Sequence, residues 1–277
     1  MTLGVLAALI GVGLIVGFVS GLIGIGGGVL IVPFLYFFYG HPGWSGWSVD
    51  PSMEATIAHA TSLAIILPTG LAAALAHHCD ELVEWRAAVP IAAVAALAAV
   101  AGANLAVLLP AELLKLMFGL LLIGSGVNLT RREEGHAREQ LRLTKPAVIG
   151  IGIAIGLLSA MLGVGGGVLA IPLLVYVVGL DIRRVAATSI AIVALTAASG
   201  TLTYAVAGWG DPGRPPGSLG YIHLVAAIPI LFASMLTVKA GAIANQRMKT
   251  RQLKLLFALV FLGLGLQLVV QNAGQLF

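Results

Sequence analysis

The sequence predicts an all-α membrane protein that crosses the bilayer several times. Of its 277 residues, 59% are hydrophobic and only 9% are charged, and the mean hydropathy is +1.04. Soluble domains carry about a quarter charged residues, so a single water-exposed globule is excluded. The apolar runs are continuous over about 20 residues, the length of a membrane-spanning helix, whereas a barrel strand alternates over about 10.

Cysteine content and charge narrow the class further. The single cysteine, Cys79, excludes a disulfide framework and a cysteine-based metal site. The net charge of +4 is more informative about membrane orientation than about nucleic-acid binding, which we do not expect. The first lysine or arginine is Arg86, so the apolar N-terminus lacks the basic region of a signal peptide. We therefore expect residues 3–23 to be a retained helix.

The chain contains an internal duplication. Residues 16–35, VGFVSGLIGIGGGVLIVPFL, align without a gap with residues 155–174, IGLLSAMLGVGGGVLAIPLL, and ten of the twenty positions are identical. The same offset of 139 pairs Leu114-Lys115-Leu116 with Leu253-Lys254-Leu255. We expect a first transmembrane repeat over 1–129, a charged linker over 130–145 and a second repeat over 146–277.

Each half contains five apolar segments that we expect to be helical. They cover residues 3–23, 29–39, 55–76, 87–108 and 112–129 in the first half, and 147–162, 168–180, 184–207, 221–244 and 253–272 in the second. The second segment of each half is too short to cross a bilayer upright, which takes about 20 residues. Each preceding glycine cluster is therefore expected to break a helix and begin a half-helix at membrane depth. Counts of eight to ten helices fit this pattern.

Basic residues predict the orientation. The linker is rich in arginine and is expected in the cytoplasm, whereas the loops 40–53 and 208–220 share one basic residue, Arg214, and are expected outside. Loop 77–86 is then inside while its counterpart 208–220 is outside. The two repeats are accordingly expected to have inverted topology, with both termini external, in a bacterial cytoplasmic (inner) membrane.

Glycine-broken helices in inverted repeats are typical of the binding site of a secondary transporter near the bilayer midplane. A helix that begins inside the bilayer leaves up to four backbone N–H groups without partners, and an anion can accept hydrogen bonds from them. The glycines expected to begin the half-helices are Gly26, Gly27, Gly28, Gly165, Gly166 and Gly167. The alternative is that these glycines only permit close helix packing.

Polar residues inside the predicted spans are further candidates. Thr61-Ser62 and Thr188-Ser189 recur at an offset of 127, and they either line the site or bond back to their own helices. His59 is ionisable at membrane depth, so it is a candidate pathway residue and proton carrier. Lys239 either extends its amine to the membrane surface or attracts an anion.

The run His77-His78-Cys79-Asp80-Glu81 resembles a metal-binding sequence. Adjacent ligands on one short loop rarely enclose a metal ion, and the sequence offers no second cluster to complete the site. We expect a solvated cytoplasmic turn, no cofactor and no enzymatic activity. An intramembrane metal-dependent enzyme that uses this loop remains the alternative from another class.

Two long motifs carry a family resemblance. GLIGIGGGVLIVPFL at 21–35 and SAMLGVGGGVLAIPLL at 159–174, together with the Thr-Ser pairs, resemble the TauE/SafE family over essentially the whole chain. This family of sulfite exporters and toluene sulfonate uptake permeases is associated with sulfite, sulfoacetate and organosulfonates. The positions that match its pattern are Gly24, Gly26, Gly27, Gly28 and Pro33, their partners Gly163, Gly165, Gly166, Gly167 and Pro172, and the pairs Thr61-Ser62 and Thr188-Ser189.

The resemblance and the residues together lead to one main hypothesis. The protein is expected to be a secondary transporter, an exporter, that binds a small sulfur-containing anion between two half-helix N-termini and works by alternating access. Its expected partners are this anion, membrane lipid and a coupling ion, with a proton carried by His59 as one version. Another small anion or metabolite on the same scaffold is the alternative substrate.

Overall fold

The computed structural model describes residues 2–23, 25–79, 81–131, 143–180, 182–247 and 250–273. The first half contains α1 (Leu3–Ile23), α2 (Gly28–Gly40), α3 (Pro42–Ser45), α4 (Pro51–Cys79), α5 (Trp85–Leu108) and α6 (Ala111–Arg131). The second contains α7 (Lys145–Leu162), α8 (Gly167–Leu173), η1 (Leu174–Val178), α9 (Ile182–Ala207), β1 (Ser218–Leu219), β2 (Ile222–His223), α10 (Leu224–Arg247) and α11 (Thr250–Ala273). Each predicted apolar segment is helical over most of its length, although the segment 221–244 begins with β2 and becomes helical at Leu224.

The fold class predicted from the sequence is confirmed. Among the described residues, six helices are long and apolar enough to cross a membrane, namely α1, α4, α5, α7, α9 and α10. α2 is a shorter apolar helix, as expected for a half-helix that follows a glycine break. The second half-helix continues as the π-helical segment η1, which the sequence did not indicate. The protein is an all-α polytopic membrane protein.

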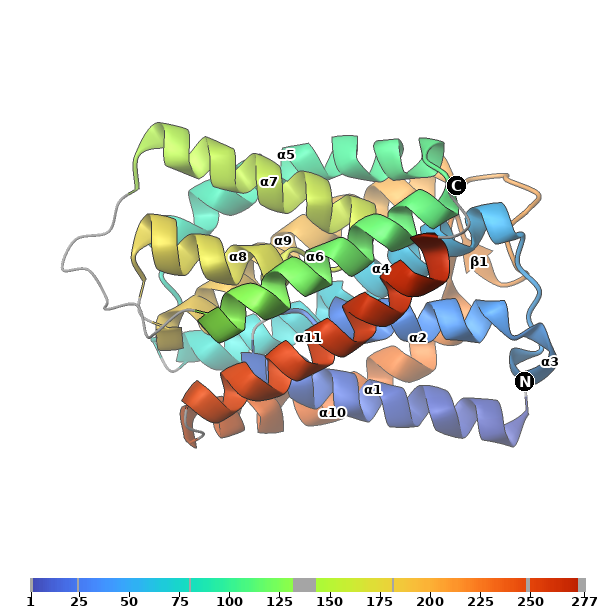
Figure 1. The fold of residues 1–277 in the computed structure, drawn as a ribbon, viewed down its shortest axis with the longest axis horizontal. Helices are drawn as coiled ribbons and strands as arrows, with labels where there is room; N and C mark the ends of the chain where they lie inside the picture. Colours follow the sequence, from blue (N-terminus) through green and yellow to red (C-terminus); the bar gives the residue numbers. More distant parts are fainter. Residues whose placement is uncertain are drawn as a thin grey trace.

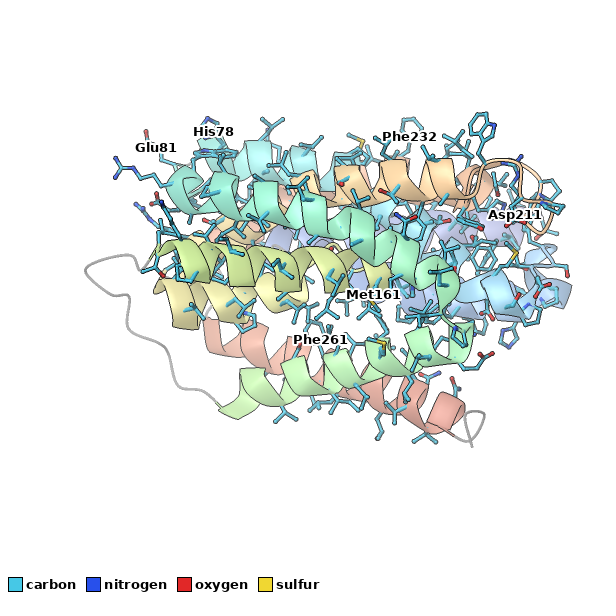
Figure 2. The ribbon with its side chains drawn as sticks, turned by 90° about the horizontal axis from the view of Figure 1, so that it is seen from above. His78, Glu81, Met161, Asp211, Phe232 and Phe261 are labelled. Atoms are coloured by element: carbon cyan, nitrogen blue, oxygen red, sulfur yellow. The ribbon has the colours of Figure 1, made fainter. Side chains whose placement is uncertain are left out.

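The helices run along the long axis of the molecule and the loops gather at its two ends (Figure 1). The start of α1, the end of α11, α3 and β1 lie at one end, which we call the hairpin end. The end of α6 and the start of α7 lie at the other, which we call the linker end. His78 and Glu81 are at the linker end, and Asp211 is at the hairpin end (Figure 2). This grouping matches the two sets of loops predicted from basic residues. Which end faces the cytoplasm stays a prediction, and residues 132–142 of the linker lie outside the described part.

Small residues bring helices of the two halves into backbone contact. A Cβ atom on Gly17 of α1 would overlap the carbonyl oxygen of Ser234 on α10. The equivalent Gly156 of α7 approaches the carbonyl oxygen of Ala95 on α5 in the same way. Close approach at such residues is what stabilises helix pairs in lipid, where apolar burial gives no advantage. At these positions the glycines therefore serve packing.

The remaining helices form a buried centre and one outer layer. α4 and α9 contact each other and are buried more deeply than the other four long spans. α6 and α11 lie side by side on one face of the bundle (Figures 1 and 2). A Cβ atom on Gly119 of α6 would lie 3.1 Å from the carbonyl oxygen of Gly265 on α11. The functional residues described below come mainly from α4 and from the helices packed against it.

Candidate functional site

Two breaks in the helices follow α1 and α7. Gly26 and Gly27 have φ angles of 87° and 77°, and the equivalent Gly165 and Gly166 have 75° and 85°. This left-handed region is open to glycine and rarely adopted by other residues. The glycine clusters therefore make turns between a helix and a half-helix, as predicted. Gly24, which belongs to the first cluster, lies outside the described residues.

The two breaks cross in contact with each other. A Cβ atom on Gly28 would lie 2.6 Å from the carbonyl oxygen of Gly163 and 2.7 Å from the Cα of Val164. A Cβ atom on Gly167 would lie 2.6 Å from the carbonyl carbon of Ile25. We call residues 25–28 and 163–167 the glycine crossing. Met161, just before the second break, lies near the middle of the long axis (Figure 2).

Apolar side chains of α4 and α9 enclose the crossing symmetrically. A Cβ atom on Gly26 would lie 2.7 Å from Cγ1 of Val193 and 3.2 Å from Cγ2 of Ile66. For Gly165 the same two atoms are 2.8 and 3.1 Å away. Ile66 and Val193 are themselves equivalent at the offset of 127, and both are fully buried. Polar groups at the crossing are thus held in apolar surroundings.

Some backbone donors at the half-helix starts have no acceptor within the described part of the chain. The N–H groups of Leu169 and Ala170 donate to the carbonyl of Gly166 at 3.0 and 2.8 Å, whereas no acceptor is found among the described residues for those of Gly167 and Val168. In α2 the first bonds likewise run to Gly27, from Leu30 and Ile31, at 3.0 and 3.1 Å. No side chain of a described residue caps either helix. In lipid each unsatisfied group costs several kcal/mol, so these donors favour a ligand.

Sequence reasoning missed a pair of buried hydroxyls. Ser20 and Ser159 are 0% and 1% exposed, and neither Oγ has a hydrogen-bond partner among the described residues. Ser159 Oγ lies 3.3 Å from the position of a Cβ on Gly166, the residue before α8. An unpaired buried hydroxyl costs about 1–3 kcal/mol. The available signal was that the two serines are among the identities at offset 139.

The threonines hold other elements in place. Thr61 Oγ1 accepts a hydrogen bond from the backbone N–H of His223, and Thr188 Oγ1 accepts one from that of Glu84, both at 3.0 Å. Thr61 and Thr188 are equivalent at offset 127, and Glu84 and His223 at offset 139. These residues do not bond back to their own helices, which was the alternative. Their hydroxyls fix the residues that precede α5 and α10.

Ser62 and His59 connect α4 to the second break. Ser62 Oγ donates to the carbonyl of Gly163 at 2.7 Å, and Ser189, its equivalent, is also fully buried. His59 is fully buried, and a Cβ atom on Gly163 would lie 2.5 Å from its Cα. His59 Nε2 and Tyr36 Oη share a hydrogen bond of 2.5 Å. The predicted residues Ser62 and His59 therefore do border the glycine crossing.

Ser62, His59 and Tyr36 form a row of polar side chains that we call the polar line. A charged pair, Lys115 and Glu54, extends the polar line toward the hairpin end. The Lys115 ammonium lies 5.2 Å from the centroid of the Tyr36 ring and 2.8 Å from Glu54 Oε2. The side chains of Lys115 and Glu54 are only 17% and 12% exposed. Sequence reasoning used Lys115 as a marker of the duplication and did not identify it as a site residue.

Lys239 is not brought to the crossing. It is exposed on α10, and it forms no hydrogen bond or ion pair with another described residue. An exposed side chain fits the interpretation that its amine extends to the membrane surface. The charge nearest the crossing along the polar line is that of Lys115 instead.

The two histidines of the histidine-rich run have different partners, and Asp80 of this run lies outside the described residues. His77 is fully buried, with Nε2 3.3 Å from the carbonyl oxygen of Gly21 on α1. His78 Nδ1 accepts a hydrogen bond from Trp85 Nε1 at 3.1 Å. The expectation of a solvated turn is therefore wrong for His77, which joins the end of α4 to α1. No group of three His, Cys, Asp or Glu side chains suited to a metal is found in the described part of the chain.

The fold and the comparisons define a multi-pass membrane transporter. The chain belongs to the TauE/SafE family, because the family described as "Sulfite exporter TauE/SafE" matches residues 9–268. A "Probable membrane transporter protein" of Haemophilus influenzae is 32% identical over 248 residues, covering 90% of this chain and 92% of the relative.

More distant relatives carry the same description. A "Probable membrane transporter protein" of Methanocaldococcus jannaschii is 26% identical and covers 94% of both chains. The "Probable membrane transporter protein YunE" of Bacillus subtilis is 25% identical and covers 95% of this chain and 97% of its own. No solved structure matches this chain.

Proposed function

We propose that this protein is a secondary transporter, an exporter, of a small sulfur-containing anion such as sulfite, sulfoacetate or an organosulfonate. The observation that carries the proposal is the group of buried donors at the second break. Among the described residues, the N–H groups of Gly167 and Val168 have no acceptor, and Ser159 Oγ, which lies close to Gly166, has no hydrogen-bond partner. The description of the matching family supports a sulfur oxyanion as the class of substrate.

The proposed site binds an anion with neutral donors. Backbone N–H groups and the positive end of each half-helix favour negative charge by about 0.3–1 kcal/mol, and by more in a dry site. Hydrogen bonds from neutral donors to a charged acceptor add about 1.5–3 kcal/mol each. Ser20 at the first break would provide the donor equivalent to Ser159. Lipid and the apolar Ile66 and Val193 exclude water, which strengthens all these interactions.

Alternating access would follow from the duplication. We take the repeats as 1–129 and 146–277, joined by a cytoplasmic linker at 130–145, in inverted orientations across the inner membrane. The hydrogen bonds of Thr61 and Thr188 to equivalent backbone positions support two arrangements of similar energy. Movement of one repeat against the other would then expose the glycine crossing first on one side and then on the other.

Flux into proteoliposomes tests this function. Purified protein reconstituted into liposomes is expected to carry radiolabelled sulfite, and unlabelled sulfoacetate is expected to compete. Ser159→Ala should lower the apparent affinity by about ten- to a hundredfold, since a hydrogen bond to a charged group contributes about 1.5–3 kcal/mol. Ser234→Ala is the matched control, because this buried serine bonds to Leu231 on its own helix. Absence of flux for every sulfur-containing anion tried would refute the substrate class.

A further inference from the structure

We propose that the Glu54–Lys115 pair is an exchange site, in which a proton on Glu54 is bound together with the transported anion on Lys115. The proposal rests on the proposed function and deepens it, because it assigns the coupling ion and the residue that takes it. Anion and proton would then cross in the same direction.

The pair is held away from water near the starts of two helices. Glu54 is in the first turn of α4, and Lys115 Nζ reaches it from α6 at 2.8 Å. Both side chains are largely buried, with the fully buried Leu114 beside Lys115. A buried charge whose partner is removed is strongly destabilised, because it has already lost its hydration. Lys115 therefore requires one negative charge beside it at all times.

The side chains of Tyr36 and His59 connect the pair to the glycine crossing by direct contacts. Lys115 lies over the Tyr36 ring, Tyr36 is hydrogen-bonded to His59, and His59 packs against Gly163. In this proposal, an anion that leaves the crossing toward the hairpin end would pass His59 and Tyr36 and then reach the Lys115 ammonium.

Exchange at Lys115 conserves charge. A proton from water binds to a carboxylate oxygen of Glu54 and makes it a neutral acid as the transported anion takes the place of the carboxylate beside the Lys115 ammonium, so the ammonium is never without a negative partner. When the anion leaves, Glu54 loses its proton to water and pairs with Lys115 again. The net charge of the site is zero before exchange, and it remains zero when the anion is singly charged.

The other titratable groups near the pair fit this role less well. Tyr36 and Tyr39 on α2 are neutral and bonded to His59 and His223. Asp50 is exposed before α4 and is bonded to Ser52. On α6, Glu112 lies three residues before Lys115 without a hydrogen bond or ion pair to another described residue.

His59 was the proton carrier suggested by the sequence, but its surroundings disfavour a charge. It is fully buried, and the Tyr36 hydroxyl that shares a hydrogen bond with its Nε2 is neutral. A protonated His59 would be a buried cation without a counter-ion. Glu54 contacts its counter-ion, Lys115. When Glu54 gains a proton and loses its negative charge, the transported anion supplies the negative charge beside Lys115 instead.

Proton uptake on anion binding tests the exchange directly. Purified protein in weakly buffered detergent solution is mixed with methanesulfonate or nitrate, two anions that do not titrate near neutral pH, and the pH change is recorded with a dye. Wild type and Glu112→Gln are expected to take up about one proton for each anion bound, and Glu54→Gln none. The affinity of wild type should fall about tenfold for each unit of pH increase where Glu54 is ionised, and that of Glu54→Gln should not change.

Lys115 variants separate exchange from a folding defect. Lys115→Arg keeps the charge and is expected to retain proton uptake, whereas Lys115→Gln should lose both uptake and pH-dependent binding. Retained proton uptake in Glu54→Gln, or no uptake by wild type with either anion, overturns the exchange. Proton uptake with nitrate alone supports the exchange but counts against a sulfur-containing substrate, so the two proposals fail separately.

Discussion

Gly28→Ala tests how tightly the two helix breaks are packed at the crossing. Gly28 begins α2, and its φ is not in the left-handed region, so alanine is permitted there by the backbone and the whole effect is steric. The new methyl group would lie 2.6 Å from the carbonyl oxygen of Gly163, 2.7 Å from Cα of Val164 and 2.9 Å from Cδ1 of Ile66. Two of these three atoms belong to the backbone and cannot move by a change of rotamer.

The expected magnitude follows from these distances. Carbon atoms pack best at about 3.5–4.0 Å, so the two breaks must separate by roughly 1 Å to admit the methyl group. Overpacking of this kind costs about 1–3 kcal/mol, and backbone displacement places Gly28→Ala toward the upper limit, about 3 kcal/mol. For a chain of this size, 1 kcal/mol lowers the unfolding midpoint by about 2–4 °C, so a fall of about 6–12 °C is expected.

Thermal unfolding of the detergent-purified protein measures this effect. Gly124→Ala is the matched control, since nothing lies within 4 Å of a Cβ atom there and alanine favours a helix over glycine by about 0.5–1 kcal/mol. If Gly28→Ala unfolds at the same temperature as Gly124→Ala, the crossing is not a close backbone contact. The double variant Gly28→Ala/Gly167→Ala should lose less stability than the sum of the two single losses, because one separation of the two breaks relieves both steric clashes.

Three further outcomes are expected. Thr61→Val and Thr188→Val each leave a backbone N–H unpaired and should lower the free energy of unfolding by about 1–3 kcal/mol; a loss in only one of them would show that the two hydrogen bonds are not equivalent. Burial and the hydrogen bond to Asp211 raise the pKa of Tyr221 to about 12. The unfolded chain loses this proton from about pH 10, so above that pH it binds fewer protons than the folded chain. The free energy of unfolding of wild type should therefore fall between about pH 10 and 12. Unfolding measured across that range should show a less steep fall for Tyr221→Phe. Lys239→Gln should leave sulfite flux within about twofold of wild type, because an exposed lysine contributes little, and a tenfold loss of flux would place that lysine on the pathway.

The helix breaks could be predicted because their signal is local and occurs twice. Left-handed backbone needs glycine, and a recurring Gly-Gly-Gly before a short apolar segment indicates such a break without knowledge of the partner. What the breaks contact could not be predicted in this way. Gly28 lies against Gly163, and Thr61 bonds to the backbone of a residue 162 positions away. These contacts depend on how the two halves pack together, and sequence spacing does not encode that packing.

Lys115 and Lys239 show the same limit of prediction from sequence alone. Lys239 and Lys115 both interrupt apolar helices, and distance from a loop does not reveal which way a side chain points. Packing of α6 against α4 turns Lys115 toward Glu54, 61 residues away in sequence, while Lys239 faces outward from α10. Ser20 and Ser159 were missed because a serine in an apolar helix usually bonds back to its own helix. Only the structure shows that these two lack such bonds.

Some features of the site recur in both halves of the chain, and others occur in the first half alone. The glycine breaks, Ser20 with Ser159, and the threonine pair all recur in both halves, and all are uncharged. The side chains that connect the charged pair to the crossing are not duplicated, since the positions equivalent to His59 and Tyr36 are Ala186 and Val175. The charges themselves recur in the sequence, as Asp181 at the offset of 127 from Glu54 and Lys254 at the offset of 139 from Lys115. A neutral duplicated site alone would bind an anion equally from either side and would respond little to pH. The Glu54–Lys115 exchange would make transport depend on the proton concentration, through a connection to the crossing that only the first half contains. If this division holds, Glu54→Gln should retain anion flux and lose the pH dependence of that flux. Ser159→Ala should bind the anion more weakly and keep the pH dependence of flux.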